Sequence, residues 1–294
     1  MRKPILYSLF TFLFFACSFD VDLGRRPSEQ KLSLYALISP EKPISIRLSA
    51  TVPITETKFP IIDDARIQLY ENDFWIGTFT YRSEWEYAID YQPKAGQTYT
   101  IIAEADGFPS IKAVETLPAN IEAIDVSAMT FQYPTLTLSD YILGTAEFEL
   151  NDDSEYTVNY YEIIPSGYGF SVSNEAVSMD AYRDYPVPMG SILFTNQTFA
   201  GKSIHFSIHA EYSGGYSGPN GAHYYTRMSI RKVSPAYYTY KNTWYRHQSN
   251  KSYSDYDVLG ALLVSNSPVK MFSNIENGYG IFASYSEMII TSGQ

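Results

Sequence analysis

Lys31-Leu-Ser-Leu-Tyr-Ala-Leu-Ile38, the turn Ser39-Pro-Glu-Lys-Pro43 and Ile44-Ser-Ile-Arg-Leu-Ser-Ala50 indicate the fold class of this chain. Apolar and polar residues alternate with a period of two in both apolar stretches, which is typical of half-buried β-strands. In the second stretch, Ile44, Ile46 and Leu48 would share one buried face. The segment therefore predicts two consecutive strands joined by a short turn.

The same pattern continues to residue 118, interrupted by turns rich in Gly, Pro, Asn and Asp. Further strands are expected at 65–70, 74–81, 98–105 and 111–116. Short strands at this spacing are typical of a β-sandwich. We therefore expect residues 31–118 to form an immunoglobulin-like sandwich of about seven strands. The chain has one cysteine, so the Cys–Trp–Cys core of a true immunoglobulin domain is excluded.

Leu117-Pro-Ala-Asn120 is the expected domain boundary, and residues 119–294 are expected to form a second β-sandwich. Residues 164–200 are rich in Tyr, Pro, Gly and Ser and predict a long irregular excursion. One helix is predicted near 235–248, with Ser234 as its cap and Pro235 in its first turn. The polar stretch 250–267 predicts a link, and a short strand is expected at 269–272. The fold class predicted is thus mainly all-β: two sandwiches, the second with long loops and one short helix.

The N-terminus has the pattern of a secretory signal peptide, expected to cover residues 1–16. Arg2 and Lys3 precede an apolar run that is too short to span a bilayer. Leu13-Phe-Phe-Ala-Cys17 resembles a bacterial lipobox, which predicts lipidation of Cys17 and a polar tether over 17–30. The alternative is an ordinary cleaved signal in which the cysteine is incidental.

Charge and composition restrict the partners. Removal of Arg2 and Lys3 with the signal leaves 19 basic and 32 acidic residues, a formal charge of −13. This balance argues against nucleic acid, which requires a basic surface, and leaves the lipid as the expected link to a membrane. The 27 tyrosines fit strand faces with packed rings and solvated hydroxyls.

Motifs that carry enzyme chemistry are missing or weak in the sequence. No Gly-x-Ser-x-Gly elbow or phosphate-binding glycine loop is present. His205 and His209 would share one face of a strand, but the sequence provides no third ligand for a metal. We therefore expect no enzymatic activity, no metal and no cofactor.

Phe272-Ser-Asn-Ile-Glu-Asn-Gly-Tyr-Gly-Ile-Phe-Ala283 resembles the C-terminal signature of the lipoproteins grouped as domain of unknown function 4249. Leu34–Pro40, Thr51–Ile54 and Asp64–Asn72 fit the N-terminal half of the same family. Phe194–Lys202 resembles its middle block, although Asn196 stands where an aspartate is expected. The resemblance implies an envelope lipoprotein of Bacteroidetes-type bacteria, often found alongside TonB-dependent outer-membrane receptors. It brings no catalytic residues.

The expected function is therefore a non-catalytic outer-membrane or cell-surface lipoprotein, an accessory or binding partner of a TonB-dependent uptake system. A surface adhesin or pilus-type structural lipoprotein is the alternative, and an envelope hydrolase is a third. Whether the protein faces the periplasm or the cell surface stays open, as do the receptor and the oligomeric state.

A possible contact surface for a partner is expected in the loops 164–190 and 212–223. Aromatic residues gather there among Gly, Ser and Pro, outside any strand period, and exposed aromatics on a rigid scaffold are common binding anchors. The alternative is that these rings cover the edge of the sandwich. They are Tyr168, Phe170, Tyr182, Tyr185, Tyr212 and Tyr216.

Overall fold

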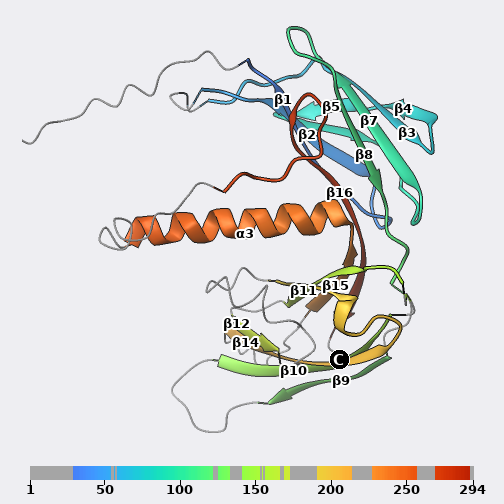
Figure 1. Cartoon of the computed structure of the whole chain (residues 1–294), viewed down its shortest axis with the longest axis vertical. Coiled ribbons are helices and arrows are strands. Elements are labelled where there is room, and N and C mark those ends of the chain that lie inside the picture. The colour runs from blue at the N-terminus through green and yellow to red at the C-terminus, as the bar shows by residue number, and fades with distance from the viewer. Residues whose placement is uncertain are drawn as a thin grey trace, which may run out of the picture.

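The fold is known from a computed structural model. It describes residues 29–53, 56, 58–121, 125–132, 141–152, 154, 156–165, 169–172, 191–213, 227–256 and 269–291. Within these ranges the chain is mostly β-strand, arranged in three sheets, with one long α-helix (Figure 1). The predicted all-β class is confirmed, while the immunoglobulin-like topology of the first sandwich stays a prediction.

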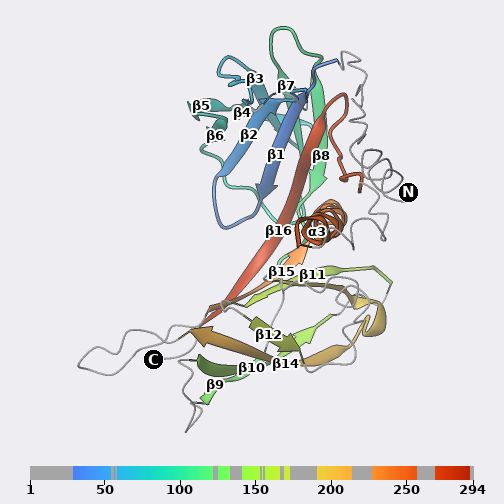
Figure 2. The same ribbon diagram turned by 90° about the vertical axis from the view of Figure 1, so that its left-hand side faces the viewer.

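An eight-stranded sheet contains strands from both ends of the chain. Its order is β13 (Ile192–Thr195), β11 (Tyr160–Pro165), β15 (Arg227–Val233), β16 (Tyr279–Thr291), β1 (Leu32–Ile38), β2 (Ile44–Ala50), β6 (Glu86–Ile89) and β5 (Thr80–Ser83). β16 has 13 residues, a length of roughly 40 Å. Its first half pairs in parallel with β1, and its second half pairs antiparallel with β15. Figure 2 shows β16 running from the N-terminal strands to the later ones.

Two four-stranded sheets cover the two halves of the large one. The first has the order β4 (Phe74–Thr78), β3 (Arg66–Glu71), β7 (Thr98–Glu104) and β8 (Ile111–Thr116). The second has the order β12 (Gly169–Val172), β14 (Ser203–Ser213), β10 (Tyr141–Asn151) and β9 (Asp125–Gln132). The large sheet is therefore shared by two sandwich-like layers. The N-terminal layer contains the first small sheet, and the C-terminal layer contains the second.

Each layer encloses its own hydrophobic core. Leu34 and Leu48 of the large sheet pack with Ile67 and Ile101 of the first small sheet. The second core joins β11, β13 and β15 to β10 and β14, and its members include Phe148, Tyr161, Ile163, Phe194, Phe206 and Ile230. Full burial of such a side chain contributes about 1.5–3 kcal/mol, so these two cores hold the layers together.

Local sequence explains the N-terminal strands. The burial of β1 and β2 alternates as the sequence predicts, so that every second residue enters the core. β3 and β4 are joined by Asn72 and Asp73, which have φ angles of 47° and 68°. Two consecutive residues with positive φ form the turn that best matches the twist of a two-residue hairpin. The connection between β3 and β4 is thus a tight turn.

Several predicted elements differ in the structure. The single strand expected at 74–81 is two strands in different sheets, because β4 pairs with β3 whereas β5 pairs with β6. The excursion 164–200 was wrong in part, since β12 and β13 lie within it. Both have four residues, too few to establish a period among Gly and Tyr. Residues 269–272 form no strand; the backbone N–H of Phe272 instead bonds the hydroxyl of Thr243, 3.1 Å away.

The predicted helix is present as α3 (Pro235–Tyr256) and is longer than expected. It extends into the stretch expected to be a polar link, and that expectation was wrong for residues 250–256. Ser234 caps it, since the Tyr237 N–H donates to the Ser234 hydroxyl over 3.2 Å. Tyr237 is 1 % exposed and packs with Ile281 and Ala283 of β16. The aromatic face of α3 is therefore packed on the large sheet, where Figure 2 shows the helix beside β16.

The boundary at residues 118/119 stays a prediction. Residues from the C-terminal side of this boundary nevertheless pack in the N-terminal core. Ile275 and Phe282 belong to the same core as Leu34, although they lie at the other end of the chain. The N-terminal layer is therefore completed by C-terminal residues.

Candidate functional site

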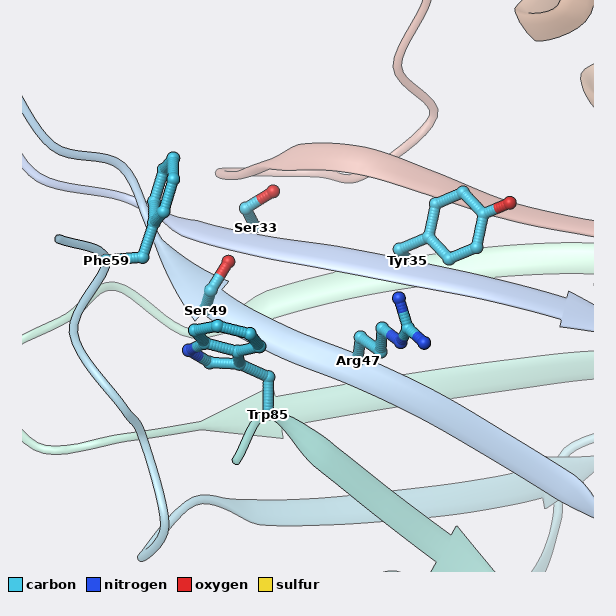
Figure 3. A pocket seen from close by; sticks show the side chains of 6 residues that line it. All are labelled: Ser33, Tyr35, Arg47, Ser49, Phe59 and Trp85. Atoms are coloured by element: carbon cyan, nitrogen blue, oxygen red, sulfur yellow. The ribbon is translucent and has the colours of Figure 1, made fainter. Parts of the chain in front are cut away.

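A groove lies on the outer face of β1 and β2, opposite the core side of these strands. It has a volume of about 380 Å³, and Figure 3 shows the six side chains that line it. They are Ser33, Tyr35, Arg47, Ser49, Phe59 and Trp85. The volume lies in the range of small-molecule sites, about 300–1,000 Å³.

Two cross-strand pairs form the floor of the groove. Ser33 lies opposite Ser49, and Tyr35 lies opposite Arg47 in the antiparallel register of β1 and β2. Alternation along the strands buries their neighbours and turns these four side chains outward. The groove thus rests on two regular strands, which are rigid supports for a binding site.

Trp85 is positioned by the turn between β5 and β6. Glu84, the residue before it, has a φ of 50°, a conformation that costs a non-glycine residue about 1 kcal/mol or more. The hydroxyl of Tyr81 donates to the Glu84 carbonyl over 3.2 Å, and the Leu48 N–H donates to the Trp85 carbonyl over 2.8 Å. These bonds fix the turn against β2, and Figure 3 shows the indole ring beside Ser49.

Phe59 comes from the segment that follows β2. A single antiparallel bridge between Ser49 and Ile61 ties this segment to the end of β2. Phe59 is 56 % exposed, and Figure 3 shows its ring on the opposite side of Ser49 from Trp85. A large apolar ring held in solvent in this way is available for contact.

Helix α3 lies at the other end of the groove. The ring of Tyr35 meets that of Tyr240 edge-on, with centroids 6.3 Å apart and an interplanar angle of 63°. Burial and the neighbouring Tyr240 raise the pKa of Tyr35, whereas Arg47 lowers it in part. The Tyr35 hydroxyl is therefore a neutral hydrogen-bonding group at physiological pH.

Two donors at the groove lack partners within the described chain. Arg47 is exposed and forms no ion pair there, although Glu86 is its cross-strand neighbour on β6. The indole N–H of Trp85 is buried and also has no hydrogen-bond partner among these residues. Buried polar groups are nearly always satisfied, so this indole N–H is an exception among the described residues.

This combination of groups is suited to binding a ligand. Rings supply apolar contact area, and hydroxyl, indole and guanidinium groups supply orientation. Among the described residues of the lining there is no carboxylate, histidine or cysteine. Among the described residues, no three His, Cys, Asp or Glu side chains are grouped as a metal site would require.

A cluster of charged side chains around the buried Glu162 lies under α3. Glu162 of β11 is fully buried and accepts bonds from Tyr237 (2.5 Å) and Ser191 (2.7 Å). Lys241 and Arg231 form ion pairs with the same carboxylate, each at 3.4 Å. Burial and the Glu162 carboxylate raise the pKa of Tyr237, so its hydroxyl remains a donor.

The remaining contacts of this cluster are also within the protein. Arg231 forms a 3.0 Å ion pair with Glu287 and stacks over the Tyr285 ring at 4.3 Å. Every charge is thus paired across α3, β11, β15 and β16. We therefore interpret the cluster as structural: it fastens α3 to the sheet.

The residues predicted as sites lie mostly outside the described residues. This holds for Cys17, Tyr168, Tyr182, Tyr185 and Tyr216.

Phe170 and Tyr212 lie on regular strands of the second small sheet. Phe170 is on β12, opposite Ala210 of β14, so its expected place in an irregular loop was wrong. Tyr212 is on β14, opposite Ile142. Whether the predicted residues contact a partner stays a prediction.

Sequence reasoning missed the groove. The outward positions of Tyr35 and Arg47 follow from the alternation of β1 and β2, and this signal was available. Phe59 and Trp85 carry no such signal, because a turn and a single bridge bring them to the strands.

A family model matches residues 18–290 of the chain and is described as Domain of unknown function (DUF4249). The chain belongs to the DUF4249 family. The match covers nearly the whole sequence, including the groove, so the resemblance noted in the sequence is confirmed at the level of the family. A comparison with curated proteins finds no match.

Two solved structures have a low overall similarity to this DUF4249 protein. Chitinase ChiA74 from Bacillus thuringiensis is 13 % identical with a TM-score of 0.20, over 63 % of this chain and 27 % of the chitinase. The chain thus spans about a quarter of that enzyme. The B domain of a biofilm associated protein is 6 % identical with a TM-score of 0.21, over 88 % of this chain and 85 % of that domain. No helix among the described residues is both long and apolar enough to cross a membrane.

Proposed function

We propose that this DUF4249 protein is a non-catalytic, lipid-anchored envelope protein. In this proposal it binds a ligand or partner through the groove and serves as an accessory of a TonB-dependent uptake system. The observation that carries the binding role is the groove itself: three aromatic rings and Arg47, which has no ion pair among the described residues, on a rigid two-stranded floor. Sites of this composition fix a ligand by apolar contact and orient it by a few polar groups.

The sequence supports the remaining parts of the proposal. The N-terminal pattern ending at Cys17 supports a lipid anchor in the outer membrane. The acidic balance is consistent with attachment by lipid rather than by charge. The receptor partnership rests on the family resemblance.

Crosslinking in the native envelope tests the receptor partnership. Mild crosslinking followed by purification of the lipidated protein is expected to recover a TonB-dependent receptor. Trp85→Ala should reduce this recovery, because it removes the largest ring of the groove. Trp75→Ala is the matched control, since Trp75 lies on β4 outside the groove and is 60 % exposed. Repeated recovery without any receptor would count against the accessory role.

An adhesin or pilus-type role is the second candidate, favoured by one observation. Phe74 and Trp75 are 75 % and 60 % exposed on β4, an edge strand of the first small sheet. Exposed apolar edges can pair with other chains. This role predicts self-assembly that Trp75→Ala weakens and Trp85→Ala does not. A strictly monomeric mature protein would exclude it.

A further inference from the structure

We propose that the groove binds an acidic saccharide, a sugar chain whose rings carry carboxylates. This inference rests on the proposed binding function and names its ligand class. It depends on the shape of the lining, on the serine hydroxyls of the floor and on the charge of Arg47.

The rings of the groove suit the faces of sugar rings. Trp85, Phe59 and Tyr35 present apolar surfaces around a floor of two serines (Figure 3). A pyranose has an apolar C–H face and a rim of hydroxyls, so it can stack on an aromatic ring while its edge stays polar. A purely apolar ligand would leave the polar floor unsatisfied.

The polar groups match the rim of a sugar. The hydroxyls of Ser33 and Ser49 can donate or accept, and both lie on the floor of the groove. Sugar hydroxyls and ring oxygens accept such bonds.

Arg47 gives the groove its preference for an acid. Figure 3 shows its guanidinium extending along the floor toward Tyr35. A guanidinium binds a carboxylate through two parallel hydrogen bonds. A neutral sugar has no carboxylate to accept them. No ion pair within the described residues occupies it, even though the chain has a net charge of −11. A free cation on an acidic protein is thus complementary to an anionic ligand.

Glu86 provides a way to test the charge argument. It lies opposite Arg47 on β6, is exposed, and does not line the groove. Its carboxylate would repel an acidic ligand at Arg47, so its removal should strengthen binding. The volume of about 380 Å³ suits a mono- or disaccharide unit of such a chain.

Binding of digalacturonate to the full mature protein in detergent tests the inference, with neutral digalactose and triaspartate as comparison ligands. Calorimetry and Trp fluorescence are expected to show binding of digalacturonate in preference to both. Arg47→Gln should weaken it by about tenfold or more, the scale of a charge-assisted pair, and leave digalactose unchanged. Glu86→Gln should strengthen it. Trp85→Ala should weaken both sugars.

Two control variants report on nonspecific effects. Arg66→Gln removes an exposed cation of β3, and Trp75→Ala removes an exposed indole of β4; both should bind digalacturonate as the unaltered protein does. An unchanged melting temperature shows that Arg47→Gln acts on binding. Equal affinity for the two disaccharides, tighter binding of triaspartate, or an Arg47→Gln variant that binds normally would overturn the inference.

Failure of the inference is distinct from failure of the proposed function. If no saccharide binds but Trp85→Ala still abolishes receptor crosslinking, the groove binds a partner and the ligand class is wrong. If digalacturonate binds and no receptor is recovered, the ligand class stands and the accessory role fails.

Discussion

The hydroxyl of Ser284 donates a 2.6 Å hydrogen bond to the carboxyl group of Glu115, although the two residues are 169 positions apart. Ser284 lies at the middle of β16, and its backbone also bonds Ser234, the cap of α3. Glu115 lies near the end of β8 and is 6 % exposed. A single buried carboxyl group therefore sits where β8, β16 and α3 meet.

Glu115 should make stability fall as pH rises toward neutrality. Burial raises the pKa of Glu115 to about 7 from an ordinary 4.5, against the lowering effect of the Ser234 and Ser284 hydroxyls. Between these two values the folded protein keeps the proton and the unfolded chain loses it. Protonation of Glu115 therefore contributes about 3 kcal/mol to the free energy of unfolding below about pH 4.5. This contribution is lost by about pH 7. Glu115→Gln should abolish this contribution.

Urea unfolding of both proteins at several pH values from 5 to 8 measures this effect. Glu115→Gln should gain stability relative to the unaltered protein as pH rises. Glu104→Gln is the control, because Glu104 is an exposed carboxylate on neighbouring β7. A difference between Glu115→Gln and the unaltered protein that does not vary with pH would contradict the assignment.

Gly280 should tolerate no side chain. It has a φ of +112°, and a Cβ there would lie 1.9 Å from the carbonyl oxygen of Leu34. Gly280→Ala must therefore push β16 away from β1 and lose parallel ladder bonds. We expect a loss of about 3 kcal/mol or more in unfolding free energy. Gly96→Ala is the matched control: φ is +78° with no atom within 4 Å, and the cost should be about 1 kcal/mol. Equal midpoints in urea for the two variants would contradict the close approach.

Much of the fold was predictable because it depends on local pattern. The alternation of β1 and β2 identified the buried faces, with Leu34 and Leu48 inside. In the C-terminal turn, Asn277 and Gly280 have φ angles of 59° and 112°, which suits these two residue types. Gly278 has a different role: a Cβ there would meet the Leu32 carbonyl at 2.7 Å, so close backbone approach requires the glycine.

The long-range arrangement was not predictable from the sequence. Nothing local indicates that Tyr279 pairs with Ser33, or that the amide of Asn274 bonds both backbone groups of Phe282. The groove depends on such contacts as well, because Trp85 reaches β2 through a turn in an uncommon conformation. Pairing between distant segments is selected by the complete core, which no single window of sequence contains.

Glu162 should be necessary for stability because it is fully buried and neutralises two partly buried cations. Glu162→Gln leaves Lys241 without its partner and Arg231 with only Glu287. Loss of one member of a buried ion pair typically costs about 3–5 kcal/mol. Thermal and urea unfolding should show this loss, and 0.5 M salt should change it little, since buried pairs are weakly screened. Glu149→Gln, at an exposed position of β10, should cost less than about 0.5 kcal/mol. A loss of that same small size for Glu162→Gln would mean that the cluster does not fasten α3.

Cys17→Ser should abolish lipidation. Cys17 is the only cysteine, so no other thiol can take its place. The variant is expected to be released as a soluble protein or to remain unprocessed, whereas the unaltered protein stays in the membrane fraction. Metabolic labelling with a fatty acid followed by fractionation measures both effects. Label that persists on the variant would end the lipoprotein proposal.

A cut near Pro118-Ala119-Asn120 should nick the protein without separating its halves. The site is accessible, because Ala119 and Asn120 are exposed, although Leu117 before it is fully buried. After the cut, β16 would still pair with β1 over six residues, and Phe282 would still fill the N-terminal core. The Ser286 hydroxyl also bonds the Ala119 carbonyl over 3.1 Å, which holds the cut end on β16.

Limited proteolysis should therefore give two bands in a denaturing gel but one peak in size-exclusion chromatography, and urea should release the fragments together. Gly280→Ala, which weakens the contact between β1 and β16, should allow the nicked halves to separate at lower urea. Fragments that separate without denaturant would show that residues 119–294 fold independently of the N-terminal layer.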